Sequence, residues 1–365
     1  MTMKPVLSTL AFILLAIHTP HGQIAFGQSL FAPKLQSSQE ANMQSPEAAE
    51  VKKLNAEVVK LFNEGKFDEA LPVAKRALKI SEKAFGSNHP IVADIRTNLA
   101  ELYVEKRQYD EAEANYKRIL SIYEKAFGAD DRLVGKTLDR LAFLRVAERD
   151  FEKAGELYQR VLTIKEKALG PDHEEVVQTL TKLTDVYKKT RERGKAKPYY
   201  ERIVSIREKT FGPNHPKVAE VLERLACSLY ANGEQSEAEQ VEARANSILY
   251  KDAASKGEPV VLPSDIFDCK TIAKPHADLF QAARGMRWTG ATTLKIAVIV
   301  DETGKVTSAQ FVSGDKLFKG AAEKGAMKAR FRPTLVDGQP VKVKGEVVYG
   351  YMTMTRTVVV GPVRQ

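Results

Sequence analysis

The chain repeats itself every 42 residues, and this period constrains its fold more than any other feature of the sequence. Four copies of one segment end in Phe85-Gly86, Phe127-Gly128, Leu169-Gly170 and Phe211-Gly212. Each copy contains an Ile-x-Glu-Lys stretch before that dipeptide, and successive copies are 42 residues apart. A fixed period of this size indicates a solenoid, in which each unit buries its apolar face against the next unit.

The residues at the boundaries of each period predict two helices per unit. Glycine after a long amphipathic run is typical of a left-handed helix C-cap, because glycine has no Cβ to clash there. A polar residue two positions after each glycine is expected to cap the next helix with its side-chain oxygen. These four residues are Asn88, Asp130, Asp172 and Asn214. A second break inside each unit, such as Gly65 or Gly233, separates helix A from helix B.

Small residues recur at fixed positions of both helices, where they allow close approach of the backbones. On helix A they are Ala100, Ala142 and Ala226, and on helix B they are Ala70, Ala112, Ala154, Ala196 and Ala238. Tyr116, Tyr158 and Tyr200 follow one helical turn later. This arrangement resembles the tetratricopeptide repeat, and the 42-residue period with its closing Glu-Lys-x-Phe/Leu-Gly resembles the kinesin-light-chain type. The resemblance covers residues 48–250 and implies an all-α solenoid of about five helix pairs.

Alternating sequence replaces the period after about residue 250. Leu294, Ile296, Val298 and Val300 share one face of a predicted strand. The elements expected after it are a turn at Asp301 to Gly304, a strand at 305–312, a helix at 316–330, a turn at Asp337-Gly338 and a long strand at 341–354. The sequence therefore predicts a small α+β module behind the solenoid, with residues 251–269 as a linker and residues 356–365 as a tail.

The module resembles the C-terminal domain of the TonB family over residues 270–355. The resemblance rests on the hairpin at 300–306, the helix that begins at Gly320, and Phe331-Arg-Pro333 followed by Asp337-Gly-Gln-Pro340. It implies that a partner, such as an outer-membrane receptor, adds a peptide strand to an edge of the module's sheet. The family also suggests an alternative function, a TonB-like energy transducer for outer-membrane transport. Against it, the family's Pro-x-Tyr-Pro opening motif is reduced to Lys274-Pro-His276 in this sequence.

The N-terminus has the pattern of an export signal. Lys4 precedes an apolar run from Val6 to Ile17, which is shorter than the roughly 20 residues that span a bilayer. We expect residues 1–27 to be a signal peptide and residues 28–47 a flexible leader, so that the mature chain is periplasmic or secreted. The alternative is an uncleaved anchor that holds the chain at the inner membrane, facing the periplasm. Only that alternative implies membrane attachment, and an exported protein is not expected to bind nucleic acid.

The sequence contains no motif for catalysis, for a cofactor or for a metal site, so the chain is not expected to be an enzyme. His89, His173 and His215 occupy equivalent repeat positions, which lie roughly 10 Å apart or more in a stack and cannot share one ion; we interpret them as first-turn residues of helices. Cys227 and Cys269 either form a disulfide or, as we favour, are two unpaired apolar residues.

The positive charge of the chain is concentrated near its C-terminus. From Pro263 onward the sequence has 16 Lys and Arg residues and 9 Asp and Glu residues, so +7 of the net charge of +9 lies there. This excess favours acidic partners.

The tetratricopeptide resemblance also implies where a protein or peptide binds. In that family helix A lines the binding groove, and its groove positions transfer to this chain one by one. The candidate residues are Asn55, Val59, Phe62, Thr97, Glu101, Lys136, Asp139, Phe143, Gln178, Thr181, Asp185, Lys188, Glu223 and Tyr230. The chain is thus expected to be a scaffold of the cell envelope with one partner on the repeats and a second on the module.

Overall fold

A computed structural model describes residues 45–190, 192–273 and 291–352. The expected signal peptide, residues 28–44 of the leader, the Lys274-Pro-His276 motif and the tail lie outside these residues. The chain divides into two compact units, residues 1–149 and residues 150–365. Within the described part, no helix combines the length and the apolar character that a membrane span requires.

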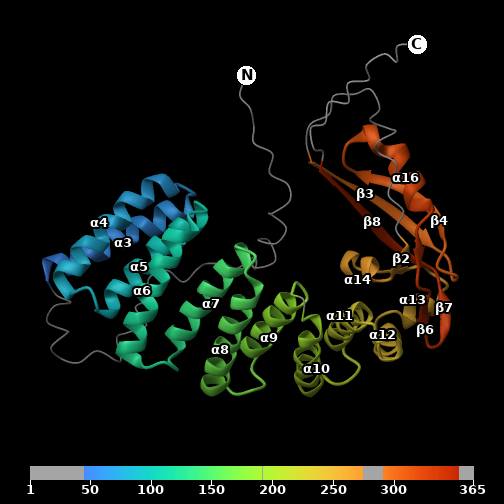
Figure 1. Ribbon diagram of the computed structural model, residues 1–365, viewed down its shortest axis with the longest axis horizontal. Coiled ribbons are helices and arrows are strands. Elements are labelled where there is room, and N and C mark those ends of the chain that lie inside the picture. The colour runs from blue at the N-terminus through green and yellow to red at the C-terminus, as the bar shows by residue number, and fades with distance from the viewer. Residues whose placement is uncertain (1–44, 191, 274–290, 353–365) are drawn as a thin grey trace, which may run out of the picture. The chain divides into compact units, whose positions relative to one another are not determined.

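The first unit consists of antiparallel helix pairs (Figure 1). Each helix contacts the next one along the chain. The helices are α3 (Pro46–Asn63), α4 (Phe67–Phe85), α5 (Pro90–Glu105), α6 (Tyr109–Phe127) and α7 (Arg132–Ala147).

The second unit continues the repeats and adds the C-terminal module. Its repeat helices are α8 (Phe151–Leu169), α9 (Glu174–Tyr187), the 3-10 helix η2 (Arg193–Ala196), α10 (Lys197–Phe211), α11 (Pro216–Asn232) and α12 (Gln235–Leu249). The module and the segment before it contain α13 (Lys251–Ser255), β1 (Val260–Val261), α14 (Ser264–Cys269), β2 (Thr271–Ala273), β3 (Ala291–Val300), β4 (Val306–Ser313), η3 (Lys316–Phe318), α16 (Lys319–Met327), β5 (Arg330–Phe331), β6 (Thr334–Val336), β7 (Gln339–Val341) and β8 (Val343–Met352).

The small residues predicted at the helix contacts are buried in both units. The five helix-B alanines are each 0% exposed, and the three tyrosines one turn later are at most 3% exposed. The helix-A alanines are equally buried. Because a larger side chain at these positions would separate the helices, the repeated alanines set how closely neighbouring helices pack.

The glycines that close each period have the positive φ that we predicted, but not the left-handed helical conformation. Gly86, Gly128, Gly170 and Gly212 have φ of 84–91° and ψ of 146–160°. This region of backbone space is open almost only to glycine. The backbone is therefore extended at the glycine that follows helix B, and the chain turns directly into the next repeat.

The predicted N-caps are wrong by one residue. The capping residues are His89, Asp131, His173 and His215, whose side chains accept hydrogen bonds from the backbone N–H two residues later. The Nδ1–N distances are 3.1–3.2 Å for the histidines, and the Asp131 Oδ1–N distance is 2.9 Å. A neutral imidazole and a carboxylate both accept here, so the aspartate completes the series of histidines.

The module is built on a four-stranded sheet with the order β1-β8-β3-β4. Strand β3 lies antiparallel to β4 on one side and to β8 on the other, and β1 lies parallel to β8. The predicted apolar face is confirmed, because Leu294, Ile296, Val298 and Val300 are at most 1% exposed. Helix α16 contacts β3 and β4.

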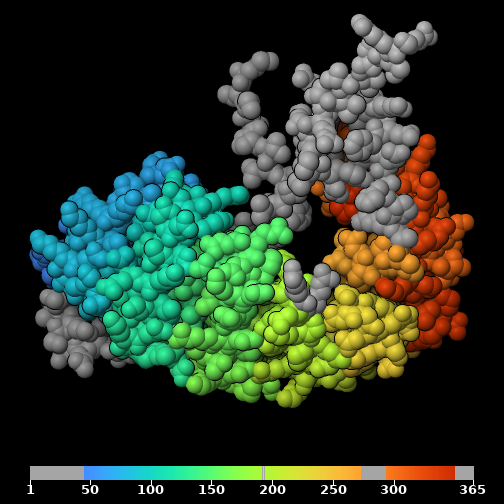
Figure 2. Space-filling view, in the orientation of Figure 1, coloured from blue at the N-terminus to red at the C-terminus, as the bar shows by residue number. Residues whose placement is uncertain are grey.

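Residues 251–269 do not form the linker that we predicted. Val260 and Leu262 donate backbone hydrogen bonds to Lys342 and Lys344, and Phe267 of α14 is 1% exposed within the module's core. A Cβ at Gly345 of β8 would overlap the Phe267 ring, so this glycine makes room for the ring. Figure 2 shows the surface of α11 and α12 (yellow) running into that of the C-terminal strands (red), and α12 contacts β6.

The cap at His89 predicts a pH-dependent stability of the first unit. Burial lowers the pKa of the His89 ring below its usual value of 6.5, so the unfolded chain takes up a proton before the native chain does. The free energy of unfolding should therefore fall as the pH falls through 6.5. His89→Asp keeps an acceptor at the cap, as Asp131 does naturally, and should lose less stability between pH 8 and pH 5 in chemical denaturation. Equal pH dependence of variant and wild type would contradict this role.

The packing of α14 predicts that a residue of the expected linker stabilises the module. Phe267→Ala removes a buried ring and should lower the free energy of unfolding by about 3–5 kcal/mol. Val261→Ala, in β1 but 66% exposed, is the control and should cost less than about 0.5 kcal/mol. Thermal denaturation followed by circular dichroism measures both, and similar small losses in the two variants would show that α14 is not part of the core.

Candidate protein-binding surface

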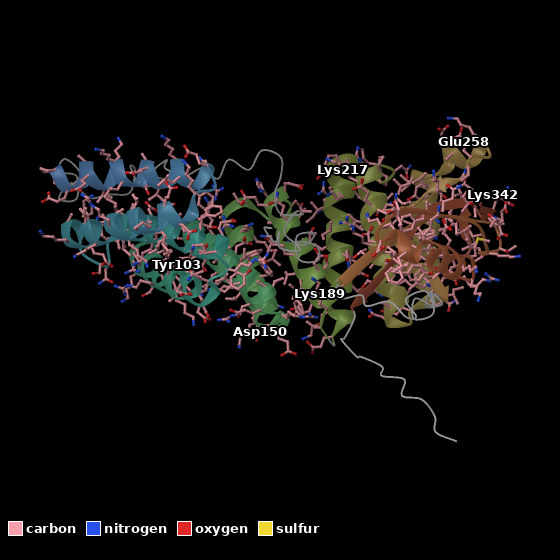
Figure 3. The ribbon with its side chains drawn as sticks, turned by 90° about the horizontal axis from the view of Figure 1, so that it is seen from above. Tyr103, Asp150, Lys189, Lys217, Glu258 and Lys342 are labelled. Carbon is pink, nitrogen blue, oxygen red and sulfur yellow. A yellow bond between two sulfur atoms is a disulfide. The ribbon has the colours of Figure 1, made fainter. Side chains whose placement is uncertain are left out.

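The candidate groove residues differ in how exposed they are. Charged and polar side chains line the helices of both units (Figure 3). In the first unit Glu101 is 7% exposed, and its carboxylate accepts from the Tyr116 hydroxyl at 2.9 Å and pairs with Arg140 Nε at 3.0 Å. Asn55 accepts a hydrogen bond from Asn98, and Thr97 donates to the Ala93 carbonyl at 2.9 Å. These three residues join helices or satisfy backbone groups.

The remaining candidates of the first unit differ in how much surface they offer. Val59, Phe62, Asp139 and Phe143 are half-buried, and Lys136 is exposed. The Phe62 ring contacts that of Phe67 with centroids 5.3 Å apart. The first unit therefore offers a partly apolar helix-A surface with one exposed cation, Lys136, among its candidates.

In the second unit, four candidates form a stripe along α9. Gln178, Asp185 and Lys188 are exposed and Thr181 is half-buried. The Thr181 hydroxyl donates to the Val177 carbonyl at 2.9 Å, and Asp185 pairs with Lys188 at 3.7 Å. The stripe extends over about 15 Å of helix at 1.5 Å per residue. It is the most exposed set among the predicted residues of this unit.

The last two candidates contact residues that follow α11 in the sequence. Glu223 is 4% exposed and accepts from the Tyr250 hydroxyl at 2.6 Å. Burial raises the pKa of the Glu223 carboxyl. Tyr230 donates to Glu242 at 2.6 Å, and the Arg332 guanidinium lies 4.1 Å from the centre of its ring. Both side chains thus connect α11 to residues beyond it in the sequence.

A buried lysine completes this attachment. Lys270 is 2% exposed and forms an ion pair with Glu242 of α12. Burial lowers the pKa of its ammonium to about 8. Arg332 donates from its backbone N–H to the Lys270 carbonyl at 2.8 Å and from its guanidinium to the Cys269 carbonyl at 3.0 Å. We call Tyr230, Glu242, Lys270 and Arg332 the anchoring cluster.

A disulfide joins Cys227 of α11 to Cys269 of α14. Our preference for two unpaired cysteines is therefore wrong. The side chains are close because Ile266 and Phe267 bury one face of α14, which places Cys269 opposite α11. The disulfide closes a loop across 42 residues and restricts the unfolded chain accordingly.

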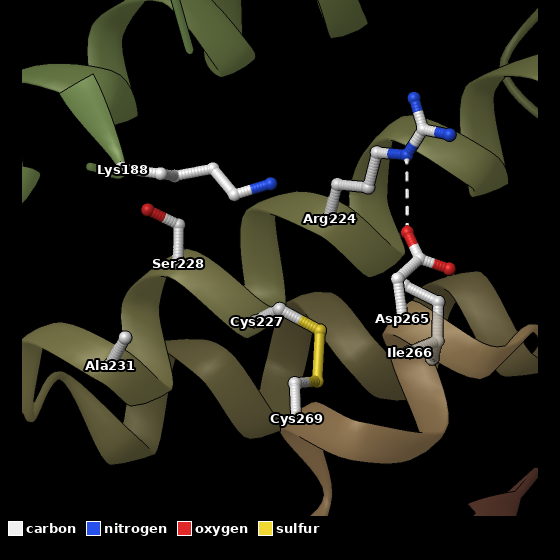
Figure 4. A pocket seen from close by; sticks show the side chains of 8 residues that line it. All are labelled: Lys188, Arg224, Cys227, Ser228, Ala231, Asp265, Ile266 and Cys269. Carbon is white, nitrogen blue, oxygen red and sulfur yellow. Dashed lines mark ion pairs between the residues drawn. A yellow bond between two sulfur atoms is a disulfide. The ribbon is translucent and has the colours of Figure 1, made fainter. Parts of the chain in front are cut away.

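A cavity of about 310 Å³ lies beside the disulfide (Figure 4). Lys188 at the end of α9 reaches over it, and Arg224 pairs with Asp265 at 3.9 Å on its rim. The buried Ser228 hydroxyl has no hydrogen-bond partner among the described residues. The cavity is lined by Lys188, Arg224, Cys227, Ser228, Ala231, Asp265, Ile266 and Cys269.

Sequence reasoning identified only Lys188 of this lining. The signal in the sequence was the presence of two cysteines, Cys227 and Cys269, which an exported protein can join in a disulfide. The hydrogen-bond capacity of the Ser228 hydroxyl and the apolar sulfurs would suit a ligand residue with both apolar and polar atoms. Within the described residues, no group of three or more His, Cys, Asp and Glu side chains is arranged to hold a metal ion.

Stacked helix pairs with buried alanines define the class, a helical-repeat protein with a small α+β module attached to its last repeat. The family model described as tetratricopeptide repeat matches residues 60–125, 133–209 and 191–250. This chain belongs to the tetratricopeptide repeat family. The model described as Gram-negative bacterial TonB protein C-terminal matches residues 276–351. Both families are generally non-catalytic, and together the repeats and the module support a protein–protein interaction scaffold.

The chain is also similar to solved structures. A Podosopora anserina protein with nearly identical TPR-like repeats of the kinesin light chain kind is 22% identical, with a TM-score of 0.49, over 59% of this chain and 99% of that one. BtubC (BKLC) from P. vanneervenii is 22% identical, with a TM-score of 0.46, over 62% of this chain and 90% of that one. Among curated proteins, none matches this chain.

The anchoring cluster predicts strong coupling between Lys270 and Glu242. Lys270→Met leaves the buried Glu242 carboxylate without its cation and should lower the free energy of unfolding by about 3–5 kcal/mol. Adding Glu242→Gln removes that uncompensated charge and should restore part of the loss. A double-mutant cycle by urea denaturation measures the coupling, and additive losses would show that the two residues do not interact.

Proposed function

We propose that this protein is a non-enzymatic scaffold of the bacterial cell envelope that binds one protein partner on its repeats and another on its C-terminal module. The observation that carries the proposal is the stripe on α9 that leads to the cavity beside the disulfide. Lys188 belongs to both. An extended peptide on α9 would therefore meet the cavity at the end of the helix.

The chemistry of this surface suits a peptide with mixed polar and apolar residues. Gln178 offers an amide that both donates and accepts, and Asp185 and Lys188 offer opposite charges. The apolar part of the cavity, including the disulfide, can take a side chain of the peptide. The Ser228 hydroxyl gives that residue a hydrogen-bond partner. These features support one binding surface composed of α9, α11 and α14.

A second partner can add a strand to the sheet of the module. Strand β4 is an outer strand that pairs with β3 only, as far as the described strands show. The Phe311 N–H of β4 donates to the Glu323 carboxylate at 2.9 Å, so a partner strand would exchange this bond for one of its own. At the other outer position β1 pairs with β8 at Val343 and Lys344 only. We therefore favour β4 as the docking edge.

The envelope location and the alternative function share one test. The similarity of residues 276–351 to TonB proteins of Gram-negative bacteria supports the envelope. A TonB-like energy transducer would need to keep its N-terminal segment as an anchor. N-terminal sequencing of the mature protein distinguishes the two, since a chain that begins near Gln28 fits the scaffold and excludes the transducer.

Site-specific photo-crosslinking in cells tests the two surfaces. A photoreactive residue at Gln178 on α9 should crosslink one protein, and one at Gln310 on β4 should crosslink a different protein. Lys52 on α3 is an exposed control position. We expect the Gln178 product to weaken at least several-fold when Lys188→Glu is added, because that change reverses the charge beside the cavity. Products that are equal at all three positions, or absent from both test positions, would contradict the proposal.

A further inference from the structure

Helix α16 and the turn before it carry exposed positive charges that can contact a ligand. Four exposed lysines lie there: Lys316, Lys319, Lys324 and Lys328. We call them the lysine face. Among the described residues none of the four ammonium groups has an ion-pair partner, whereas Lys295 and Lys342 of the module each have one.

The geometry of the helix brings two of these lysines to one side. Lys324 and Lys328 are one turn apart, whereas Lys319, five residues before Lys324, lies about 140° away around the helix axis, at the N-terminal end of α16. The opposite side of the helix is buried, since Ala322 and Ala326 are 0% exposed in the core of the module. Lys324 and Lys328 therefore lie on the side of α16 that faces away from the sheet.

The acidic residues in this segment are already engaged. The Glu323 carboxylate accepts the Phe311 N–H of β4 at 2.9 Å, and the Asp315 carboxylate accepts the Leu317 N–H at 3.0 Å. Both acidic side chains are half-buried, unlike the lysines. The net positive charge that the sequence places in the C-terminal region is thus concentrated, in part, on one exposed surface.

Two apolar side chains lie among the lysines. Met327 is 40% exposed and Leu317 is 36% exposed. Exposed apolar groups surrounded by flexible cations match the boundary between headgroups and acyl chains of a bilayer. Lysine is a compact point charge on a flexible stem, whereas paired recognition of a single carboxylate in a protein partner favours arginine. A bilayer surface carries many separate phosphate charges and therefore complements these lysines better than a single carboxylate of a protein does.

We propose that the lysine face binds the surface of an anionic lipid bilayer, with the ammonium groups on lipid phosphates and Met327 and Leu317 at the headgroup boundary. This contact needs no membrane-spanning segment and uses α16 and the turn before it, next to β4, whose Phe311 N–H donates to Glu323 of α16. The attraction is electrostatic and should weaken as salt shortens the screening length.

Vesicle co-sedimentation with the full chain tests the proposal. The chain should bind vesicles of phosphatidylcholine with phosphatidylglycerol more strongly than vesicles of phosphatidylcholine alone. Lys316→Gln with Lys324→Gln should weaken binding about 25-fold, at about 5-fold for each lysine. The matched control is Lys52→Gln with Lys53→Gln on α3, which removes the same charge and leaves the N-terminal segment unchanged. Circular dichroism verifies that both variants are folded.

Three outcomes would overturn the proposal. The first is equal binding to both kinds of vesicle, and the second is equal loss in the test and control variants. The third is retention of the chain by poly-glutamate without retention by anionic vesicles, which would assign the lysine face to an acidic polypeptide. Preferential binding to phosphatidylglycerol that is lost only in the lysine-face variant supports it.

Discussion

The attachment of the C-terminal module to the last repeat depends on a lysine that is taken out of water. A buried ammonium is costly unless a carboxylate and further hydrogen bonds compensate it. Lys270 has Glu242 as its ion-pair partner, and the second oxygen of that carboxylate accepts from Tyr230. Arg332 lies against the Tyr230 ring. With the disulfide, this cluster joins α11 and α12 to α14 and the module, so the chain continues from repeat to module without a flexible tether.

This attachment decides which part of the predicted groove is available in the second unit. Glu223 and Tyr230 are occupied by contacts to Tyr250, Glu242 and Arg332. The accessible surface is the α9 stripe, and the cavity beside the disulfide lies at its end. A partner bound there and a partner on β4 would be held by one compact unit, which is the property that a scaffold requires.

Much of this architecture could be predicted from the sequence, and the misses have physical causes. The period located the helix pairs because repeated alanines are a direct consequence of close helix packing. The sequence predicts caps one residue too early because an asparagine or aspartate is the usual cap, whereas the His89 ring also accepts the capping hydrogen bond. The sequence predicts a linker at 251–269 because β1 and α14 are too short to show a period. The anchoring cluster joins residues distant in sequence, and no local pattern reports such contacts.

The most direct test of the account is the distance between the last repeat and the module in solution. Spin labels introduced as noncanonical amino acids at Gln240 of α12 and Gln310 of β4, both exposed, report it by pulsed electron spin resonance without disturbing the disulfide. A module fixed by the anchoring cluster predicts one narrow distance distribution in the oxidised protein. A broad distribution would show that the module moves freely on a tether and would contradict the account.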